Sequence, residues 1–146
     1  MNLIELCKKA KAAKYEVASL STIQKNDALN FIAHELVSNS DSIIEANAID
    51  VKKGQENGMH EGLVDRLLLN QKRIEAIAEG LGQVAALPDP IGEELEHFER
   101  PNGLKLRKVR VPLGVIGIIY ESRPNVTADA FALTFKAGNA VILKGG

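Results

Sequence analysis

The sequence predicts an α/β chain in three stretches: helices over residues 1–90, a β-hairpin over 94–112 and one β-α-β unit over 113–146. Three observations predict this order. Apolar residues in the first stretch recur every three or four positions, the period of an amphipathic helix. Pro88 and Pro90 then end the helical pattern, and turn residues separate two short polar strands. Beyond them, two aliphatic runs flank an alanine-containing helical segment, as in a parallel sheet with its crossover helix.

The first two helices are defined by apolar stripes and by one cap. Ser21 and Gln24 form a capping box that starts the second helix. The apolar stripe of the first helix contains Leu3, Leu6, Cys7, Ala10, Ala13 and Val17. The expected buried side of the second contains Ala28, Phe31, Ile32, Leu36 and Val37.

Two further helices are expected before the prolines. One begins after Asn39 or Ser40 and ends near Gly54, and residues 55–62 form a connector. Asn70 is the cap of the next helix. Its apolar face contains Ile74, Ile77, Ala78, Leu81 and Val84.

The hairpin is expected to pair residues 94–99 with 104–111 across a turn at 101–103. The apolar alternation of the second strand slips after Leu106, which indicates a bulge there. An isolated hairpin is marginally stable, so we expect a hairpin of the oligomerisation type that pairs with a strand from elsewhere.

The β-α-β unit begins with residues 114–120, which lack alternation and therefore predict a strand buried on both faces. A helix over 128–137 follows, with Thr127 as its cap and Gly138 as its left-handed end. Residues 140–144 form the second parallel strand. Two parallel strands cannot cover their own faces, so we expect the architecture to be truncated at residue 146.

Composition excludes several classes of function. The net charge is −1 and aromatic residues make up 4% of the chain, which argues against nucleic-acid binding. No apolar run approaches the ~20 residues of a membrane span, and the N-terminus lacks the pattern of a secretory signal. The single cysteine, Cys7, lies on an apolar stripe and is expected to be buried packing. We expect a cytoplasmic protein without a membrane partner.

A metal site is also not expected. His34-Glu35 begins like a zinc-binding helix motif, but the second histidine of that motif would stand at position 38, where the chain has Ser38.

Several segments carry a family resemblance. Residues 111–130 read Val-Pro-Leu-Gly-Val-Ile-Gly-Ile-Ile-Tyr-Glu-Ser-Arg-Pro-Asn-Val-Thr-Ala-Asp-Ala, and 136–146 read Lys-Ala-Gly-Asn-Ala-Val-Ile-Leu-Lys-Gly-Gly. Together with 64–74 and 84–92, they resemble the γ-glutamyl phosphate reductases of the aldehyde dehydrogenase superfamily. The Tyr-Glu-Ser-Arg-Pro-Asn segment at 120–125 separates this family from ordinary aldehyde dehydrogenases, which share the Gly-Asn-x-Val-x-x-Lys pattern.

The resemblance implies the N-terminal part of an aldehyde-dehydrogenase-type, Rossmann-like cofactor domain. It implies NADPH-dependent reduction of L-glutamyl 5-phosphate to L-glutamate 5-semialdehyde and phosphate, a step of proline biosynthesis, in an enzyme that is a homo-oligomer at full length. The superfamily's nucleophilic cysteine lies downstream of every motif present, so we expect the catalytic domain to be absent and this chain to be an incomplete, inactive portion.

The resemblance also assigns reaction and substrate residues. Asn125 matches the asparagine whose amide donates to the oxyanion; the alternative is that it only satisfies backbone groups of the turn. Arg123 is placed to pair with the phosphate or α-carboxylate of the substrate, or else to form a salt bridge with Glu121 or Asp129.

The cofactor residues are expected at the strand ends. Lys144 matches the superfamily lysine that contacts the adenosine ribose, unless it is a solvated residue at the strand end. Gly145 and Gly146 begin the following loop. Ile119 and Tyr120 are expected to wall the cofactor cleft, although core packing is the simpler role on sequence grounds.

Two other functions remain open on the sequence. One is a different acyl-reducing member of the superfamily, for example one acting on an acyl-CoA. The other is a non-catalytic nucleotide-binding or oligomerisation module.

Overall fold

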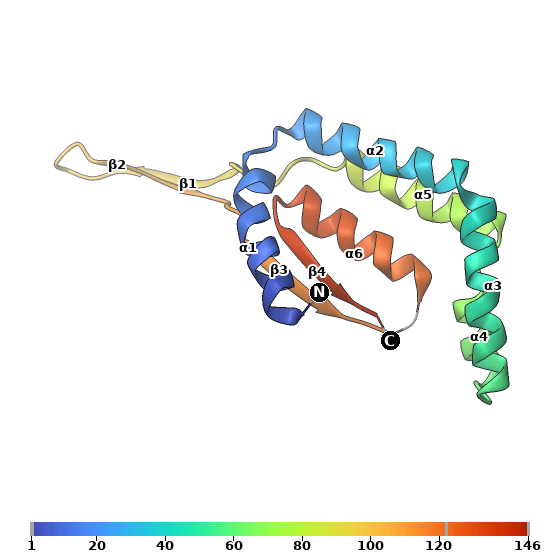
Figure 1. The fold of residues 1–146 in the computed structure, drawn as a ribbon. Helices are drawn as coiled ribbons and strands as arrows, with labels where there is room; N and C mark the ends of the chain where they lie inside the picture. Colours follow the sequence, from blue (N-terminus) through green and yellow to red (C-terminus); the bar gives the residue numbers. More distant parts are fainter. Residues whose placement is uncertain (1, 122, 146) are drawn as a thin grey trace.

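A computed structural model describes residues 2–121 and 123–145 of the chain. The predicted order of helices, hairpin and β-α-β unit is confirmed (Figure 1). The described elements are α1 (Leu3–Ser19), α2 (Thr22–Ser38), α3 (Ser40–Glu56), α4 (Glu61–Leu67), α5 (Gln71–Ala86), β1 (Glu94–Glu99), β2 (Lys105–Val109), β3 (Val115–Ile119), α6 (Pro124–Lys136) and β4 (Ala140–Lys144).

The predicted helix caps are present. The Gln24 amide donates to Ser21 Oγ at 3.3 Å, and the Ser21 amide donates to Gln24 Oε1 at 2.9 Å, which completes the capping box of α2. Asn70 Oδ1 accepts a hydrogen bond from the Arg73 amide at 2.9 Å at the start of α5. A second capping box, between Asn2 and Glu5, starts α1 and was not expected from the sequence.

The connector predicted at 55–62 is shorter in the structure, because α3 extends to Glu56 and an additional helix, α4, begins at Glu61. Gly62 donates its amide hydrogen to His60 Nδ1 at 3.1 Å, which caps α4. The buried Asn47 of α3 fixes the far end of α4: its Nδ2 donates to Leu67 O at 2.9 Å, and its Oδ1 accepts from the Leu69 amide at 2.7 Å. A side chain 20 residues away therefore ends this helix.

The core lies between α2, α5 and α6. Its buried residues are Leu29, Leu81, Ala85 and Ala132. The expected position of Phe31 in this core is wrong, since 64% of Phe31 is exposed, and Val37 is also exposed. Leu29 faces α5 instead, and Phe31 lies about 200° around the helix from it.

Cys7 is exposed, so its predicted role as buried packing is wrong. Helix α1 packs against β4, and the residues on its inner side are Leu6, Ala10, Ala13 and Val17. Cys7 is rotated by about 100° from Leu6, which turns it toward solvent.

The hairpin projects from the helical body as a two-stranded antiparallel ribbon (Figure 1). The register passes from Glu94↔Val109 to Glu96↔Lys108. The ladder is therefore irregular opposite Lys108 and Val109, beyond Leu106 as predicted, but the extra residue is Leu95 on β1 and not a residue of β2. Leu106 keeps its regular partner Phe98.

Strands β3 and β4 are parallel neighbours, paired from Val115↔Ala140 to Ile119↔Lys144. The prediction that the first strand is buried on both faces is wrong, because 87% of Ile119 is exposed and burial alternates along β3. Ile116, a half-buried residue of β3, lines a cavity together with Leu133 and Thr134 of α6, whereas the alternate residues of β3 are exposed.

Helix α6 begins earlier than predicted, with Pro124 at its first position and Arg123 as the N-cap. Proline is favoured there because its fixed φ suits the helix and its missing N–H would have no partner. Thr127 therefore lies inside the helix and is not its cap. Gly138 ends α6 at φ 72°, as predicted. Asn139 Oδ1 then accepts from the Gly114 amide at 2.8 Å, which joins the two strand starts.

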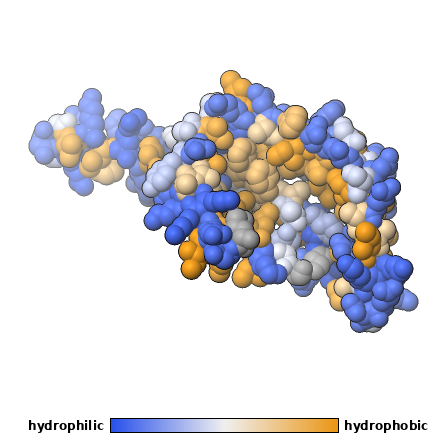
Figure 2. Space-filling model, in the orientation of Figure 1, coloured by the Kyte–Doolittle hydropathy of each residue, from blue (hydrophilic) through white to orange (hydrophobic). Residues whose placement is uncertain are grey.

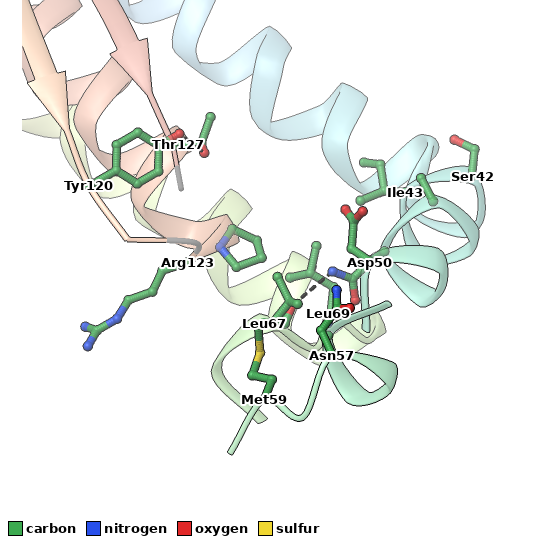
Figure 3. Close-up of a pocket in the computed structure, with 15 residues that line it drawn as sticks. Ser42, Ile43, Asp50, Asn57, Met59, Leu67, Leu69, Tyr120, Arg123 and Thr127 are labelled. Carbon is green, nitrogen blue, oxygen red and sulfur yellow. Dashed lines mark hydrogen bonds between the residues drawn. The ribbon is translucent and has the colours of Figure 1, made fainter. Parts of the chain in front are cut away.

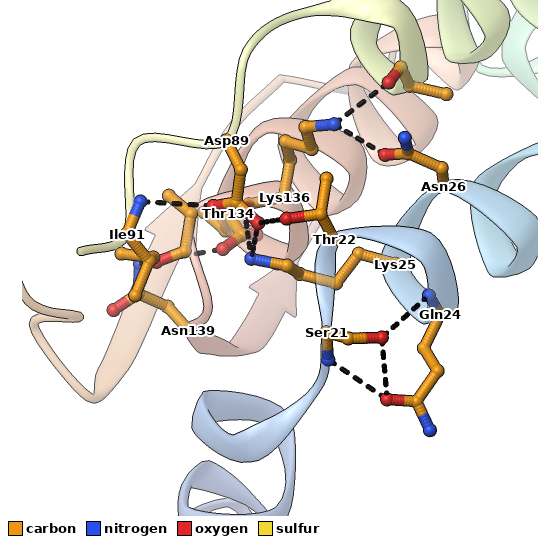
Figure 4. Close-up of polar contacts among 12 residues, drawn as sticks. Ser21, Thr22, Gln24, Lys25, Asn26, Asp89, Ile91, Thr134, Lys136 and Asn139 are labelled. Atoms are coloured by element: carbon orange, nitrogen blue, oxygen red, sulfur yellow. Dashed lines mark hydrogen bonds and ion pairs between the residues drawn. The ribbon is translucent and has the colours of Figure 1, made fainter. Parts of the chain in front are cut away.

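A buried polar network joins α2, α6 and the segment after α5 (Figure 4). Lys25 forms an ion pair with Asp89 and donates to Lys136 O at 3.2 Å. Lys136 Nζ in turn donates to Ala85 O at 2.8 Å. Asp89 also accepts from Thr22 Oγ1 at 2.8 Å. Only 2% of Lys25 and 3% of Lys136 are exposed, so the network is internal.

The network shifts two pKa values. Burial alone would raise the pKa of Asp89, but hydrogen bonds from Lys25, the Ile91 amide and Thr22, with the charge of Lys25, hold that pKa below its ordinary value. Burial lowers the pKa of Lys136, the charge of Lys25 lowers it further, and Asp89 opposes the shift.

Apolar surface remains exposed on the body, whereas the hairpin is mainly hydrophilic (Figure 2). The residues around β3 include Leu113, 86% exposed, and Ile119, 87% exposed. Among the described helices, none combines the length and apolar character needed to cross a bilayer.

Candidate functional site

The ends of β3 and β4 meet at one point of the molecule. The Tyr120 amide donates to Lys144 O at 3.1 Å, which continues the ladder one residue beyond β3. The Tyr120 and Thr127 hydroxyls lie 2.6 Å apart, which ties this strand end to α6. A Cβ at Gly145 would lie 3.6 Å from the Tyr120 ring, so the ring packs over this glycine.

A cleft of about 680 Å³ separates these strand ends from α3 and α4. Figure 3 shows Tyr120 and Thr127 on one side of the opening and Asp50 and Met59 on the other. The Arg123 guanidinium points away from this opening, so Arg123 contributes only part of its side chain to the wall. We call this space the strand-end cleft.

A second cleft, of about 490 Å³, lies between the α4–α5 corner and the start of α6. Its charged and amide side chains are Asp65, Arg66, Arg73, Arg123, Asn125 and Asp129. Asn125 Nδ2 donates to Asp129 Oδ2 at 3.2 Å across one turn of α6. We call this space the α4–α6 cleft.

Arg123 lies between the two clefts and lines both. Its Nε lies 3.3 Å from Glu121 Oε2, so the first of the two ion pairs considered from the sequence is present. The alignment is too poor for a hydrogen bond, and within residues 2–121 and 123–145 this buried Nε has no hydrogen-bond partner. The side chain as a whole is 43% exposed, which leaves its outer donors accessible to a ligand.

The structure brings together some of the predicted site residues and leaves others apart. Tyr120 and Gly145 line the strand-end cleft, and Asn125 lines the α4–α6 cleft. Ile119 and Lys144 line neither of these clefts. Both are exposed at the ends of their strands, and Lys144 Nζ donates to Gly145 O.

Two residues of the analysed motifs, Ser122 and Gly146, lie outside the described residues.

Sequence reasoning missed the contribution of α3 to the strand-end cleft and of α4 to the α4–α6 cleft. Asp50 and Arg66 were not singled out, because helix periodicity cannot show which surface of a helix faces a distant loop. The available signal was the resemblance over 64–74, which contains Arg66. In the part of the chain that the structure describes, no three His, Cys, Asp or Glu side chains gather as metal ligands.

The strand ends present one apolar and one charged side chain to solvent. Ile119 offers an exposed apolar face, and Lys144 offers a cation at the carboxyl end of β4, where open parallel sheets bind their ligands.

Comparison with known proteins finds relatives that match almost the whole chain. It is 57% identical over 139 residues to the gamma-glutamyl phosphate reductase of Heliobacterium modesticaldum, a match that covers 95% of this chain and 33% of that protein. The chain is homologous to γ-glutamyl phosphate reductases. The crystal structure of the Thermotoga maritima reductase matches with a TM-score of 0.97 at 45% identity, covering 100% of this chain and 35% of that one.

The homology extends to a more distant reductase. The crystal structure of the Saccharomyces cerevisiae enzyme has a TM-score of 0.89 at 37% identity, and the match covers 97% of this chain and 36% of that one. The chain thus spans about a third of the length of the reductases it matches. No protein-family model matches the chain. The resemblance read from 120–125 and its neighbouring segments is confirmed, as is the mixed α/β fold.

Proposed function

We propose that this chain forms part of an NADPH-dependent reductase that converts L-glutamyl 5-phosphate to L-glutamate 5-semialdehyde and phosphate. We place this reaction in proline biosynthesis in the cytoplasm. The observation that carries the proposal is that Asn125 opens on a cleft at the start of α6 in a chain 57% identical to a gamma-glutamyl phosphate reductase.

Asn125 is proposed to stabilise the negative charge that develops on the acyl oxygen during thiolate attack. A primary amide has two N–H donors, and among residues 2–121 and 123–145 one of those of Asn125 is used, by Asp129. The other can donate to the oxyanion. Asn125 also lies in the first turn of α6, where the positive end of the helix dipole favours the same charge.

Cofactor binding is assigned to the strand ends, and the attacking thiolate to a group outside the two clefts. Lys144, Ile119, Tyr120 and Gly145 are proposed to hold the cofactor, which supplies a hydride when bound. The single cysteine, Cys7, lies on α1 and lines neither cleft. The attacking thiolate is therefore assigned to another part of the enzyme.

The test is turnover in the reverse direction, with glutamate semialdehyde, phosphate and NADP. It compares this chain alone with a chimera in which the chain replaces the corresponding third of the Thermotoga maritima reductase. The proposal expects NADPH production by the chimera and none by the chain alone. A chimera that folds as the parent enzyme does but produces no NADPH contradicts the proposal.

The protruding hairpin supports a second candidate function, association with another subunit. All residues of β1 are exposed, and Leu95 and Phe98 place apolar side chains on it, 43% and 42% exposed. The paired substitution of Leu95 and Phe98 by Ser should lower the mass of the chimera assembly in sedimentation equilibrium. An unchanged mass argues against this role.

A further inference from the structure

We propose that the α4–α6 cleft binds the α-amino-acid end of the substrate, with Arg66 on the α-carboxylate and Asp129 on the α-ammonium. The inference rests on the proposed reductase function and adds to it the part of the substrate that this cleft recognises. Some charged side chains of the cleft already have an ion-pair partner, and others have none among the described residues.

Arg73 and Asp65 already satisfy each other. Arg73 donates to Asp65 Oδ1 at 2.8 Å, to Leu68 O at 2.7 Å and to Asp65 O. These bonds use the guanidinium to hold the α4–α5 corner, and they neutralise the Asp65 carboxylate. The Arg73 guanidinium is therefore committed to this corner, and its charge offsets that of Asp65.

Arg66 differs from Arg73 in its partners. It stands in the last turn of α4 and is exposed at the cleft wall. Within residues 2–121 and 123–145, no carboxylate lies within ion-pair distance of its guanidinium. A guanidinium presents a planar pair of donors that matches the two oxygens of a carboxylate.

Asp129 is the complementary group. Its Oδ2 accepts the Asn125 amide at 3.2 Å, and no cation of the described residues pairs with it. Its Oδ1 lies near Gly80 of α5, 3.9 Å from where a Cβ at that position would stand, and Asp129 is exposed. An uncompensated carboxylate beside an uncompensated arginine fits a ligand that carries both charges.

The charges of the cleft favour the amino-acid end of the substrate. Its lining contains Arg66, Arg73 and Arg123 together with Asp65 and Asp129, and the two groups without an ion-pair partner among the described residues, Arg66 and Asp129, have opposite charges. A phosphate dianion could pair with Arg66 but would be repelled by Asp129, whereas an amino-acid head finds an opposite charge for each of its groups. Its α-carbon is three bonds from the acyl carbon, so an acyl group at Asn125 places the head farther along the same cleft. The volume of about 490 Å³ is sufficient for it.

The test measures binding to the 146-residue chain, because the chain supplies all the residues of this cleft. The probe is L-glutamate 5-methyl ester, which keeps the amino-acid head and has an unreactive acyl end. Binding is followed by the shifts of the Arg66 and Asn125 backbone amides in NMR titrations. Glutaric acid monomethyl ester lacks the ammonium, methyl 4-aminobutanoate lacks the carboxylate, and inorganic phosphate is the fourth ligand.

The full probe should bind at least tenfold more tightly than either truncated ester or phosphate. Arg66→Gln should weaken it at least tenfold and remove the preference over methyl 4-aminobutanoate, while Asp129→Asn should remove the preference over glutaric acid monomethyl ester. Arg107→Gln, at a 69% exposed position on the hairpin, is the matched control and should change nothing. Absence of shifts in the wild-type chain, equal binding by Arg66→Gln, or tighter binding of phosphate overturns the proposal.

Turnover of the chimera separates this inference from the proposed function. Selective binding of the full probe without any NADPH production overturns the reductase function and leaves the amino-acid cleft in place. Turnover whose KM for the semialdehyde is the same with Arg66→Gln overturns the cleft assignment alone.

Discussion

Among single residues, Asn125 has the most direct connection to the proposed chemistry. Replacing Asn125 with Ala in the chimera removes one oxyanion donor and should lower kcat by about 10²–10³-fold. The KM for phosphate should change little, because the donor acts on charge that develops only in the transition state. Steady-state kinetics check this, with Asn30→Ala on the exposed side of α2 as the control. A raised KM with an unchanged kcat would reject the oxyanion role.

Asp89 should be important for stability. Asp89→Asn leaves Lys25, which is 2% exposed, without its carboxylate, and should lower the free energy of unfolding by about 3 kcal/mol. Urea unfolding measures this loss. Asp27→Asn, at an exposed position of α2, the helix that carries Lys25, should keep the free energy of unfolding within about 0.5 kcal/mol of the wild-type value.

The effect of Asp89 should depend on pH. Its folded-state pKa lies below the unfolded value, so the carboxylate stabilises the native state above the unfolded pKa, and this contribution is lost as pH falls through the folded pKa. The stability difference between wild type and Asp89→Asn should therefore be full near neutral pH and shrink below about pH 4. A difference that grows on acidification would contradict the assigned direction.

Among the elements, the C-terminal end of α6 depends on a glycine at position 138. Gly138 has φ 72°, and an added Cβ would lie 2.9 Å from Pro112 Cγ. Gly138→Ala should therefore lower the free energy of unfolding by about 2 kcal/mol. Gly82→Ala, inside α5 with no atom within 4 Å of the added Cβ, should instead stabilise by up to about 1 kcal/mol. Thermal unfolding of the two variants compares these opposite signs.

Elements whose ends depend on local chemistry were predictable from the sequence. The Ser21–Gln24 box, the Asn70 cap and the Gly138 terminus each involve residues within four positions of one another. The failures have tertiary causes. Helix α4 is fixed by Asn47, 20 residues earlier, and the exposure of Phe31 depends on which side of α2 faces α5.

The candidate site was predictable only in part for the same reason. Tyr120, Arg123 and Asn125 lie within six consecutive residues that the family motif identifies. Arg66 joins Arg123 and Asn125 only through the path of α4 and α5, which no local pattern describes. The assignment of Asn125 and Arg123 as site residues stays a prediction, as does that of Lys144 and Ile119.

For the whole molecule, the exposed apolar residues around β3 should cause association of the 146-residue chain. Leu113, 86% exposed, and Ile119, 87% exposed, leave apolar side chains in water beside the open edge of a two-stranded sheet. Sedimentation velocity should show a coefficient that rises with protein concentration, and Leu113→Lys should reduce this rise. A monodisperse wild-type monomer with cooperative unfolding would contradict the expectation.

The contact of Asn47 with the α4–α5 corner makes the opening of both clefts observable by hydrogen exchange. The Leu69 amide donates to Asn47 Oδ1, and Leu69 lines the strand-end cleft and the α4–α6 cleft. Its proton exchanges with deuterium when this corner detaches from α3, either alone or as part of global unfolding. A protection factor for this amide below that of the α2–α5–α6 core would therefore measure the free energy of a local opening at the wall that the two clefts share.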